Sequence, residues 1–321
     1  ASGSPALKNI VIDGTGQWVV AGPANRFAGD FRLDVAGGTL KFESGALGSG
    51  NTYSQSQIEV SNGAKLAWSG SNTDDISSRL VIPVGATAQI DLGSNNVTFG
   101  AAPSVGGGAT IQKQGAGTLT FSSAVNAPNL DVVLGVGKLV VNGTVGDVTV
   151  QSGAVLGGRG SVGNVTAGSG AIIAPGNSPD TLFGISMYLA GGSIFQWEAY
   201  KPSLGAGVGY DNIELTGALD LSGAAANNKI TLKVISLNGS NVQGGVPDSF
   251  SKDSIYSFTF ATVGSVVFPT GVTSANINDI FAIDVSQFQY SEGTASNAGL
   301  WSLSYDDAGT MTLTAVPEPS T

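Results

Sequence analysis

Hydrophobic and polar residues alternate in short runs along the first half of the chain, and a glycine-containing turn accompanies most of these runs. Each copy of this pattern places small residues, including glycine, between two apolar positions. Successive copies lie about 17 to 30 residues apart, which is the span of one coil in a repeat protein. The copies occupy residues 35–40, 60–66, 115–119, 135–139, 150–156 and 168–172, with a further one around Gly85.

The alternation predicts strands, and the glycines predict the corners between them. Segments such as Lys138–Val141 and Asp147–Val150 direct successive side chains to opposite faces, as β-strands do. Glycine adopts the positive φ that a tight corner requires, and stacked coils share a core that one coil cannot bury alone. The pattern therefore predicts a β-solenoid of about eight or nine coils, spaced about 4.8 Å apart.

An antiparallel β-sandwich is the alternative, because it also uses short strands at regular intervals. Hairpins of that fold favour Asn-Gly and Asp-Gly turns at regular spacing, and here Asn142-Gly143 is the main example. The sequence favours the solenoid for this reason.

After Pro202 the composition changes: a glycine-rich connector at 205–209 precedes longer predicted strands at 211–221, 229–237, 256–263, 280–285 and 300–315. We interpret this region as the last coils followed by a small cap resembling a β-sandwich.

The glycine turns also carry more specific motifs. They are Lys113-Gln114-Gly115-Ala116-Gly117-Thr118-Leu119, Gly137-Lys138-Leu139-Val140-Val141-Asn142-Gly143, Leu156-Gly157-Gly158-Arg159-Gly160 and Ala174-Pro175-Gly176-Asn177-Ser178-Pro179. In this order they resemble the repeats of autotransporter passenger domains. The resemblance implies a right-handed parallel β-helix over roughly residues 30–200. Asp180 departs from the family, which usually carries glycine after Ser-Pro, and this puts the local turn in doubt.

The last six residues are Val316-Pro317-Glu318-Pro319-Ser320-Thr321. They resemble the start of a PEP-CTERM sorting signal, in which a Val-Pro-Glu-Pro box precedes an apolar helix and an arginine cluster. The resemblance implies exosortase as a processing partner and a secreted protein at the cell surface or in the extracellular matrix of a Gram-negative-type bacterium. On this reading Thr321 lies where a processed product would end, and Ala1-Ser2-Gly3 reads as a processed start. A tail stiffened by prolines is the alternative.

These observations divide the chain into four regions. Residues 1–29 are a capping or exchanged strand segment, 30–200 the β-solenoid, 201–315 a C-terminal β-rich region and 316–321 the remnant of the PEP-CTERM box. The fold class is all-β: a right-handed parallel β-helix with a C-terminal cap resembling a β-sandwich.

Composition excludes several function classes. The formal charge of −10 leaves no basic stripe for nucleic acid. Cysteine and histidine are absent, which removes disulfides, thiol chemistry, Ser-His-Asp triads and histidine-containing zinc sites. No apolar run reaches the length of about 18 residues that spans a bilayer, so no membrane span is expected.

Carboxylate pairs are the remaining catalytic candidates, because glycosidases use two carboxyl groups that face one groove. Asp74-Asp75 lies in a polar excursion between coils, Asp306-Asp307 reads as a hairpin turn, and Asp211 and Glu214 share one segment. We predict that none of them is catalytic and that no cofactor is bound.

Calcium binding by acidic loops is left open as an alternative, although no known calcium-loop motif occurs and no metal ligands can be named. The four tryptophans, Trp18, Trp68, Trp197 and Trp301, are expected in packing more than in glycan binding.

The segment 7–20 is the strongest candidate for an interaction. It contains two apolar triplets with few charges to protect a sheet edge: Ile10, Val11, Ile12 and Trp18, Val19, Val20. We predict a non-enzymatic structural protein that pairs with further copies of itself through this segment, head to tail. The alternative for the segment is a cap on its own solenoid. The alternative functions are an adhesin or a module binding extracellular polysaccharide and, third, a polysaccharide hydrolase or lyase.

Overall fold

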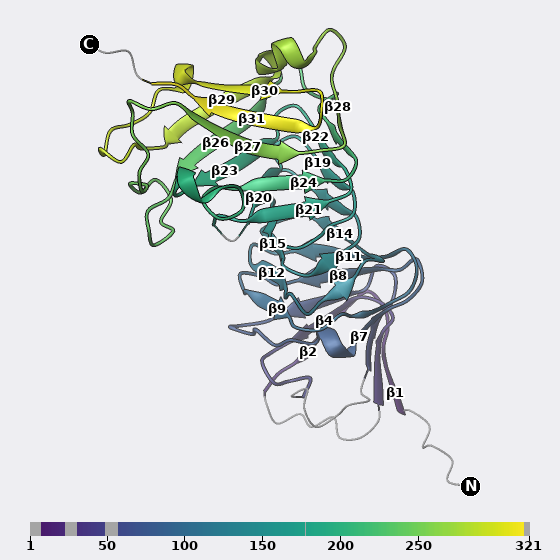
Figure 1. Cartoon of the computed structure of the whole chain (residues 1–321). Helices are drawn as coiled ribbons and strands as arrows, with labels where there is room; N and C mark the ends of the chain where they lie inside the picture. The colour runs from purple at the N-terminus through teal and green to yellow at the C-terminus, as the bar shows by residue number, and fades with distance from the viewer. Residues whose placement is uncertain (1–7, 23–30, 49–56, 177, 318–321) are drawn as a thin grey trace. The chain divides into compact units, whose positions relative to one another are not determined.

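The computed structural model describes residues 8–22, 31–48, 57–176 and 178–317 of the 321-residue chain. The chain divides into two compact units, Ala1–Val148 and Thr149–Thr321. Strands make up nearly all of the regular structure in both units (Figure 1). The helical elements of the described residues are short 3₁₀ turns: η1 (Ser77–Arg79), η2 (Pro202–Leu204), η3 (Ser274–Ile280) and η4 (Ala298–Leu300). The all-β prediction is therefore confirmed.

The first unit consists of parallel sheets. One has the order β1 (Lys8–Ile12), β3 (Phe31–Val35), β5 (Gln57–Val60), β7 (Leu80–Ile82) and β10 (Ser104–Val105). The second, called here the long sheet, has the order β2 (Gln17–Val20), β4 (Thr39–Phe42), β6 (Lys65–Trp68), β8 (Thr87–Asp91), β11 (Ala109–Gln114) and β14 (Leu130–Leu134). A third contains β9 (Val97–Phe99), β12 (Thr118–Phe121) and β15 (Lys138–Val141), and β13 (Asn126–Ala127) pairs with β16 (Thr144–Val145).

The chain visits these sheets in a fixed order, from β7 to β8 to β9 and then from β10 to β11 to β12. Each strand pairs with its counterpart one coil away, which is the topology of a parallel β-helix. The predicted solenoid is thus confirmed, and the antiparallel sandwich is excluded as a description of this unit. The strand β17 (Val148–Val150) contains the boundary between the units.

The second unit continues the same scheme. One sheet contains β18 (Val155–Gly158), β20 (Ile172–Pro175), β23 (Ile194–Ala199), β26 (Ile230–Ser236) and β29 (Phe281–Gln287). Another contains β19 (Val165–Ala167), β22 (Met187–Leu189), β25 (Ala218–Asp220) and β28 (Ser265–Val267). A third has the order β21 (Thr181–Gly184), β24 (Asn212–Leu215), β27 (Tyr256–Thr262), β31 (Thr310–Ala315) and β30 (Trp301–Tyr305).

Glycines form the corners where the sequence predicted them. Gly115, Gly137, Gly153 and Gly170 have φ between 77° and 78°, a conformation that residues with a Cβ rarely adopt. Each coil needs the same positive φ at its corner, and this explains why glycine recurs at that position of the motif.

Inward-facing side chains of successive coils stack into columns. In the first unit Phe42 and Trp68 lie 4.8 Å apart between ring centroids, and Phe99 and Phe121 lie 5.7 Å apart. Trp68 and Phe99 join these pairs at 6.4 Å, so aromatic rings form one continuous column in the core. Such stacking adds to the stability that burial of the rings provides.

The second unit ends in antiparallel strands. β31 pairs antiparallel with both β27 and β30, and the turn from β30 to β31 is the hairpin predicted at Asp306-Asp307. The Asp306 carboxylate accepts hydrogen bonds from the amides of Ala308 and Thr310, each at 2.9 Å. Beneath this hairpin Phe258 is 1% exposed and contacts the rings of Trp197, Phe250 and Trp301. One sheet of the last coil is thus closed by an antiparallel hairpin and packed aromatic rings, whereas β28 and β29 are the outermost described strands of the other two sheets.

Candidate functional site

The segment predicted to pair with other subunits forms the outermost strands of two sheets. β1 is the first strand of its sheet and β2 is the first strand of the long sheet. Within the described ranges, no strand pairs with the other edge of either one. Such an edge carries backbone donors and acceptors that can pair with another strand.

The side chains of these two strands are unusually exposed for apolar residues. Ile10 pairs in register with Leu33, and Trp18 pairs with Leu40, which places both in columns that are buried in the next coil. Even so, Ile10 is 40% exposed and Trp18 is 54% exposed. Ile12 is buried and Val20 is half-buried, whereas the outward-facing Val11 and Val19 are exposed. Among the described residues, the core is thus open at its first coil.

The backbone hydrogen bonds establish which groups face this open edge. The carbonyl of Ile12 accepts from the Ala36 amide at 2.8 Å, and the carbonyl of Val20 accepts from the Glu43 amide at 3.1 Å. In a parallel ladder, successive residues direct their N–H and C=O groups to opposite neighbours. Val11 and Val19 therefore direct theirs away from the sheet. Substitutions at Val11 and Val19 can therefore remove backbone donors from the open edge without breaking the hydrogen bonds that join β1 to β3 and β2 to β4.

The Asp74-Asp75 pair does not face one groove. The Asp74 carboxylate accepts from the Ser44 hydroxyl at 2.8 Å and from the Gly45 amide at 2.7 Å. The Asp75 carboxylate accepts instead from the amides of Ser77 and Gly100. The two side chains diverge, and each accepts from a backbone amide that is distant in sequence.

Asp211 and Glu214 also diverge, because Glu214 is exposed and Asp211 is fully buried. Asp211 instead lies beside Asp180 and Glu198, whose amides donate to its carboxylate at 3.0 Å each. Burial, followed by the negative charge of Glu198, raises the pKa of Asp211 well above its usual value. The Ser178 hydroxyl and the Gln243 amide donate to Glu198. Sequence reasoning missed this acidic cluster, although the unusual Asp180 marked its position.

Lys113 explains the first residue of the Lys-x-Gly-x-Gly motif. Its side chain is fully buried, and its ammonium donates to the carbonyls of Gly115 at 2.6 Å, Val136 at 2.8 Å and Gly117. Desolvation lowers the pKa of Lys113 to about 8, and the Asp91 carboxylate opposes that shift. The Lys113 ammonium thus joins the glycine corners of two successive coils. Sequence reasoning recognised the motif but not this role.

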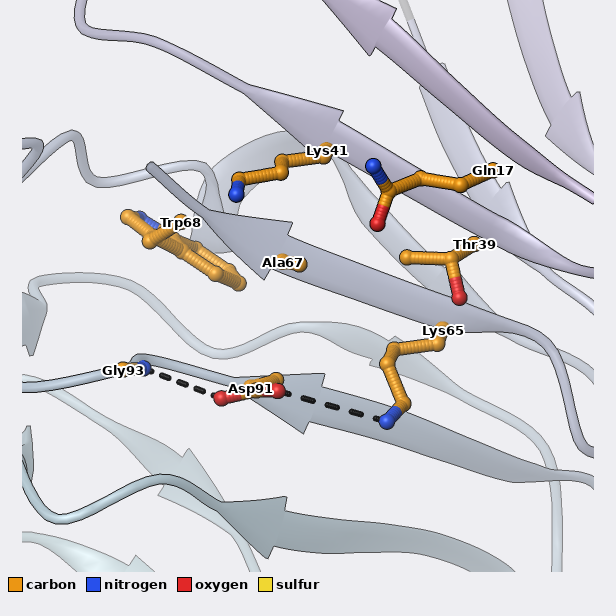
Figure 2. A pocket seen from close by; sticks show the side chains of 8 residues that line it. All are labelled: Gln17, Thr39, Lys41, Lys65, Ala67, Trp68, Asp91 and Gly93. Atoms are coloured by element: carbon orange, nitrogen blue, oxygen red, sulfur yellow. Dashed lines mark hydrogen bonds and ion pairs between the residues drawn. The ribbon is translucent and has the colours of Figure 1, made fainter. Parts of the chain in front are cut away.

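A small hollow lies on the outer face of the long sheet, across β2, β4, β6 and β8 (Figure 2). Its volume is about 240 Å³, and it is lined by Gln17, Thr39, Lys41, Lys65, Ala67, Trp68, Asp91 and Gly93. The Lys65 ammonium lies 4.0 Å from Asp91, whose other oxygen accepts from the Gly93 amide at 3.0 Å. The hollow therefore combines charged, amide and hydroxyl groups in one place.

Three of the four tryptophans are buried, in agreement with the expected packing role: Trp68, Trp197 and Trp301. Trp18 is the exception.

In the sorting motif, the Val316 amide donates to the Leu300 carbonyl at 3.0 Å and Pro317 is half-buried, while Glu318 and Pro319 lie outside the described residues.

In the described part of the chain, no group of three or more acidic side chains is arranged to hold a metal ion. No described helix is long and apolar enough to cross a membrane.

The fold and these features define a parallel β-helix protein whose first coil is open among the described residues. The sequence matches no known family model and none of the curated proteins with which it was compared.

Proposed function

We propose that this protein is a non-enzymatic structural component of the bacterial cell surface or extracellular matrix, and that it assembles head to tail. The strands β1 and β2 supply the pairing edge in this proposal. The observation that carries it is the open first coil, where Ile10 and Trp18 occupy core positions and are nevertheless exposed.

The composition of this edge supports pairing. Protein sheets usually protect an edge strand with charges, prolines or bulges. β2 contains no charged residue and no proline, and its register with β4 continues without a bulge. Pairing with another strand would satisfy the outward backbone groups of Val11 and Val19 and would bury Trp18.

The second unit offers an edge of matching kind. Among its described strands, β28 and β29 are the outermost strands of their sheets, and both pair in parallel with the preceding coil. A parallel strand from another copy would extend these sheets in the same sense. Because this contact joins two different surfaces, it propagates into a filament.

Localisation at the surface is supported by the Val316–Pro319 sequence and its resemblance to the PEP-CTERM box. Processing by exosortase is part of this proposal, since that enzyme handles the family that the box resembles.

The test uses the full chain with Val11→Pro and Val19→Pro together. Proline removes the N–H groups that face the open edge and is tolerated on edge strands. The matched control is Val11→Thr with Val19→Thr, which keeps both N–H groups. We expect filaments from the wild type and the threonine variant by negative-stain electron microscopy, and folded monomers from the proline variant by light scattering and circular dichroism.

Two results would overturn the proposal. One is a proline variant that forms the same filaments as the wild type. The other is a wild-type protein that stays monomeric at concentrations on the order of 100 μM, together with immunogold labelling that finds no filaments on intact cells. A variant without residues 1–20 provides a second test, because it should also lose assembly.

A further inference from the structure

The hollow on the long sheet exists because a small residue lies between long ones. Lys41, Ala67 and Asp91 are register neighbours on β4, β6 and β8, so their side chains lie side by side on the outer face. The side chain of Ala67 is a single methyl group, whereas its neighbours on both sides project further. Figure 2 shows Ala67 at the centre, with Lys41, Lys65, Thr39, Gln17 and Trp68 around it. The floor of the hollow is thus the methyl group of Ala67.

We propose that this hollow binds a sugar ring that carries one carboxylate, as in a uronic acid unit of an acidic polysaccharide. This site touches the open edge only through Gln17 on β2, its other lining residues belong to later coils, and the proposal does not depend on filament assembly. The volume of about 240 Å³ is below the usual range of about 300–1,000 Å³ for ligand pockets, which suits a single ring.

The charge of the hollow selects an anion with a single charge. Two ammonium groups, of Lys41 and Lys65, face one carboxylate, of Asp91, so the net charge of the lining is 2 − 1 = +1. The Lys65 ammonium is already held loosely by Asp91 at 4.0 Å. No carboxylate in the described residues forms an ion pair with Lys41. One ligand carboxylate would balance this charge, which is unusual in a protein whose total formal charge is −10.

The uncharged groups suit the hydroxyls of the same ring. The Gln17 amide can donate and accept, and the Thr39 hydroxyl can do the same. They occupy register-paired positions on β2 and β4, and Thr39 is in turn paired with Lys65 on β6. The Trp68 ring is 3% exposed and packs in the core against Phe42, so the apolar surface that the hollow offers to a sugar ring is the methyl group of Ala67.

The same row continues beyond the hollow. Gln89 follows Lys65 in register on β8, and Gln112 follows Gln89 on β11. These amides lie on the outer face at the coil spacing of about 4.8 Å. The Gln89 amide is already bonded to the Gly63 carbonyl and to Gln114, so Gln112 is the further partner for an oligomer, and we expect a trimer to bind more tightly than the single sugar acid.

The test is isothermal titration calorimetry at low ionic strength with a trimer of galacturonic acid. We expect a dissociation constant on the order of 1 mM or below, because a shallow site contributes little surplus over the cost of association. The comparison ligands are a neutral trimer of glucose and inorganic phosphate. Both should bind at least about tenfold more weakly than the acidic trimer.

Three variants separate the site from general charge effects. Lys41→Ala with Lys65→Ala removes the cations, and Ala67→Leu fills the floor without changing any charge. Each should weaken binding by about tenfold or more. Lys138→Ala with Lys229→Ala removes the same charge elsewhere and should change the affinity by less than about twofold.

The proposal is overturned if the acidic trimer does not bind, if phosphate binds as tightly as the trimer, or if the Lys138/Lys229 variant weakens binding as much as the Lys41/Lys65 variant. Unchanged binding by the Ala67→Leu variant also contradicts it, provided that circular dichroism shows this variant to be folded. None of these results depends on whether the protein forms filaments.

Discussion

The two units of this protein treat the end of a solenoid differently. In the first unit the opening coil leaves Ile10 and Trp18 partly exposed at core positions, and its strands keep a parallel edge without a partner in the described residues. In the second unit the chain reverses direction, and an antiparallel hairpin with Trp301 at 5% exposure follows the last coil. A β-helix needs a special structure to end, because each coil otherwise presents the same edge to the next.

The units also differ in the charge that they bury. The first unit buries the cation of Lys113 among backbone carbonyls, and the second buries the carboxyl group of Asp211 between two amides and near Glu198. Burial disfavours the charged form in both cases, so it shifts the two pKa values in opposite directions. The stability of the two units should therefore depend on pH in opposite senses.

The largest expected effect tests the difference between the two ends. Phe258→Ala removes a ring that is 1% exposed and should lower the free energy of unfolding by about 3–5 kcal/mol. Trp18→Ala removes a ring that is 54% exposed and should cost less than about 1 kcal/mol in the monomer. Denaturant unfolding followed by circular dichroism measures both, and equal losses would show that the first coil is closed in solution.

The second effect concerns the buried cation. Lys113→Met keeps the length of the side chain but leaves three carbonyls without their donor, and each buried acceptor that loses its partner costs about 1–3 kcal/mol. We expect a total loss of about 2–4 kcal/mol after partial relaxation. Lys138→Met is the matched control, because Lys138 is exposed and its replacement should change stability by less than about 0.5 kcal/mol. A neutral Lys113→Met result would mean that water replaces the ammonium.

The smallest effect is the dependence on pH. The pKa of Lys113 is about 8 in the folded state and 10.5 in its ordinary state, so between these values the unfolded chain binds more protons. Stability of the first unit should therefore rise as the pH increases from 8 to 10.5. Lys113→Met should remove this rise.

The pKa of Asp211 is raised, so the folded state holds its proton at pH values where the unfolded chain has lost it. Stability of the second unit should fall as the pH rises from about 4 through the folded pKa. Asp211→Asn should remove this fall. Unfolding curves recorded across the pH range measure both trends. If the stability of both units changed in the same direction with pH, the proposed difference between the two buried charges would be wrong.

Local patterns in the sequence were sufficient to predict the solenoid. Strand alternation at Lys138–Val141 and the glycine corner at Gly137 depend on residues close together in the chain, and the structure has both. The hairpin at Asp306 was predicted for the same reason, because the turn is formed by the residues that signal it.

The groups that meet across coils could not be predicted in this way. Asp211 contacts Asp180, which is 31 residues away, and Lys113 reaches Val136, which is 23 residues away. The irregular repeat leaves the register between coils undetermined, and a shift by one residue moves each side chain to the other face. The hollow around Ala67 has the same origin, because it joins residues from four coils.

The sequence by itself determined the kind of fold, because the period of alternation and the backbone freedom of glycine act over a few residues. It also indicated the apolar segment at Ile10–Val20 as a candidate edge. Only the tertiary structure decided that this segment forms an edge with no partner strand in the described ranges, that Lys113 and Asp211 are buried, and that Lys41 and Lys65 share one hollow. Those outcomes depend on the register of one coil against the next, which is set by the packing of all the inward columns together.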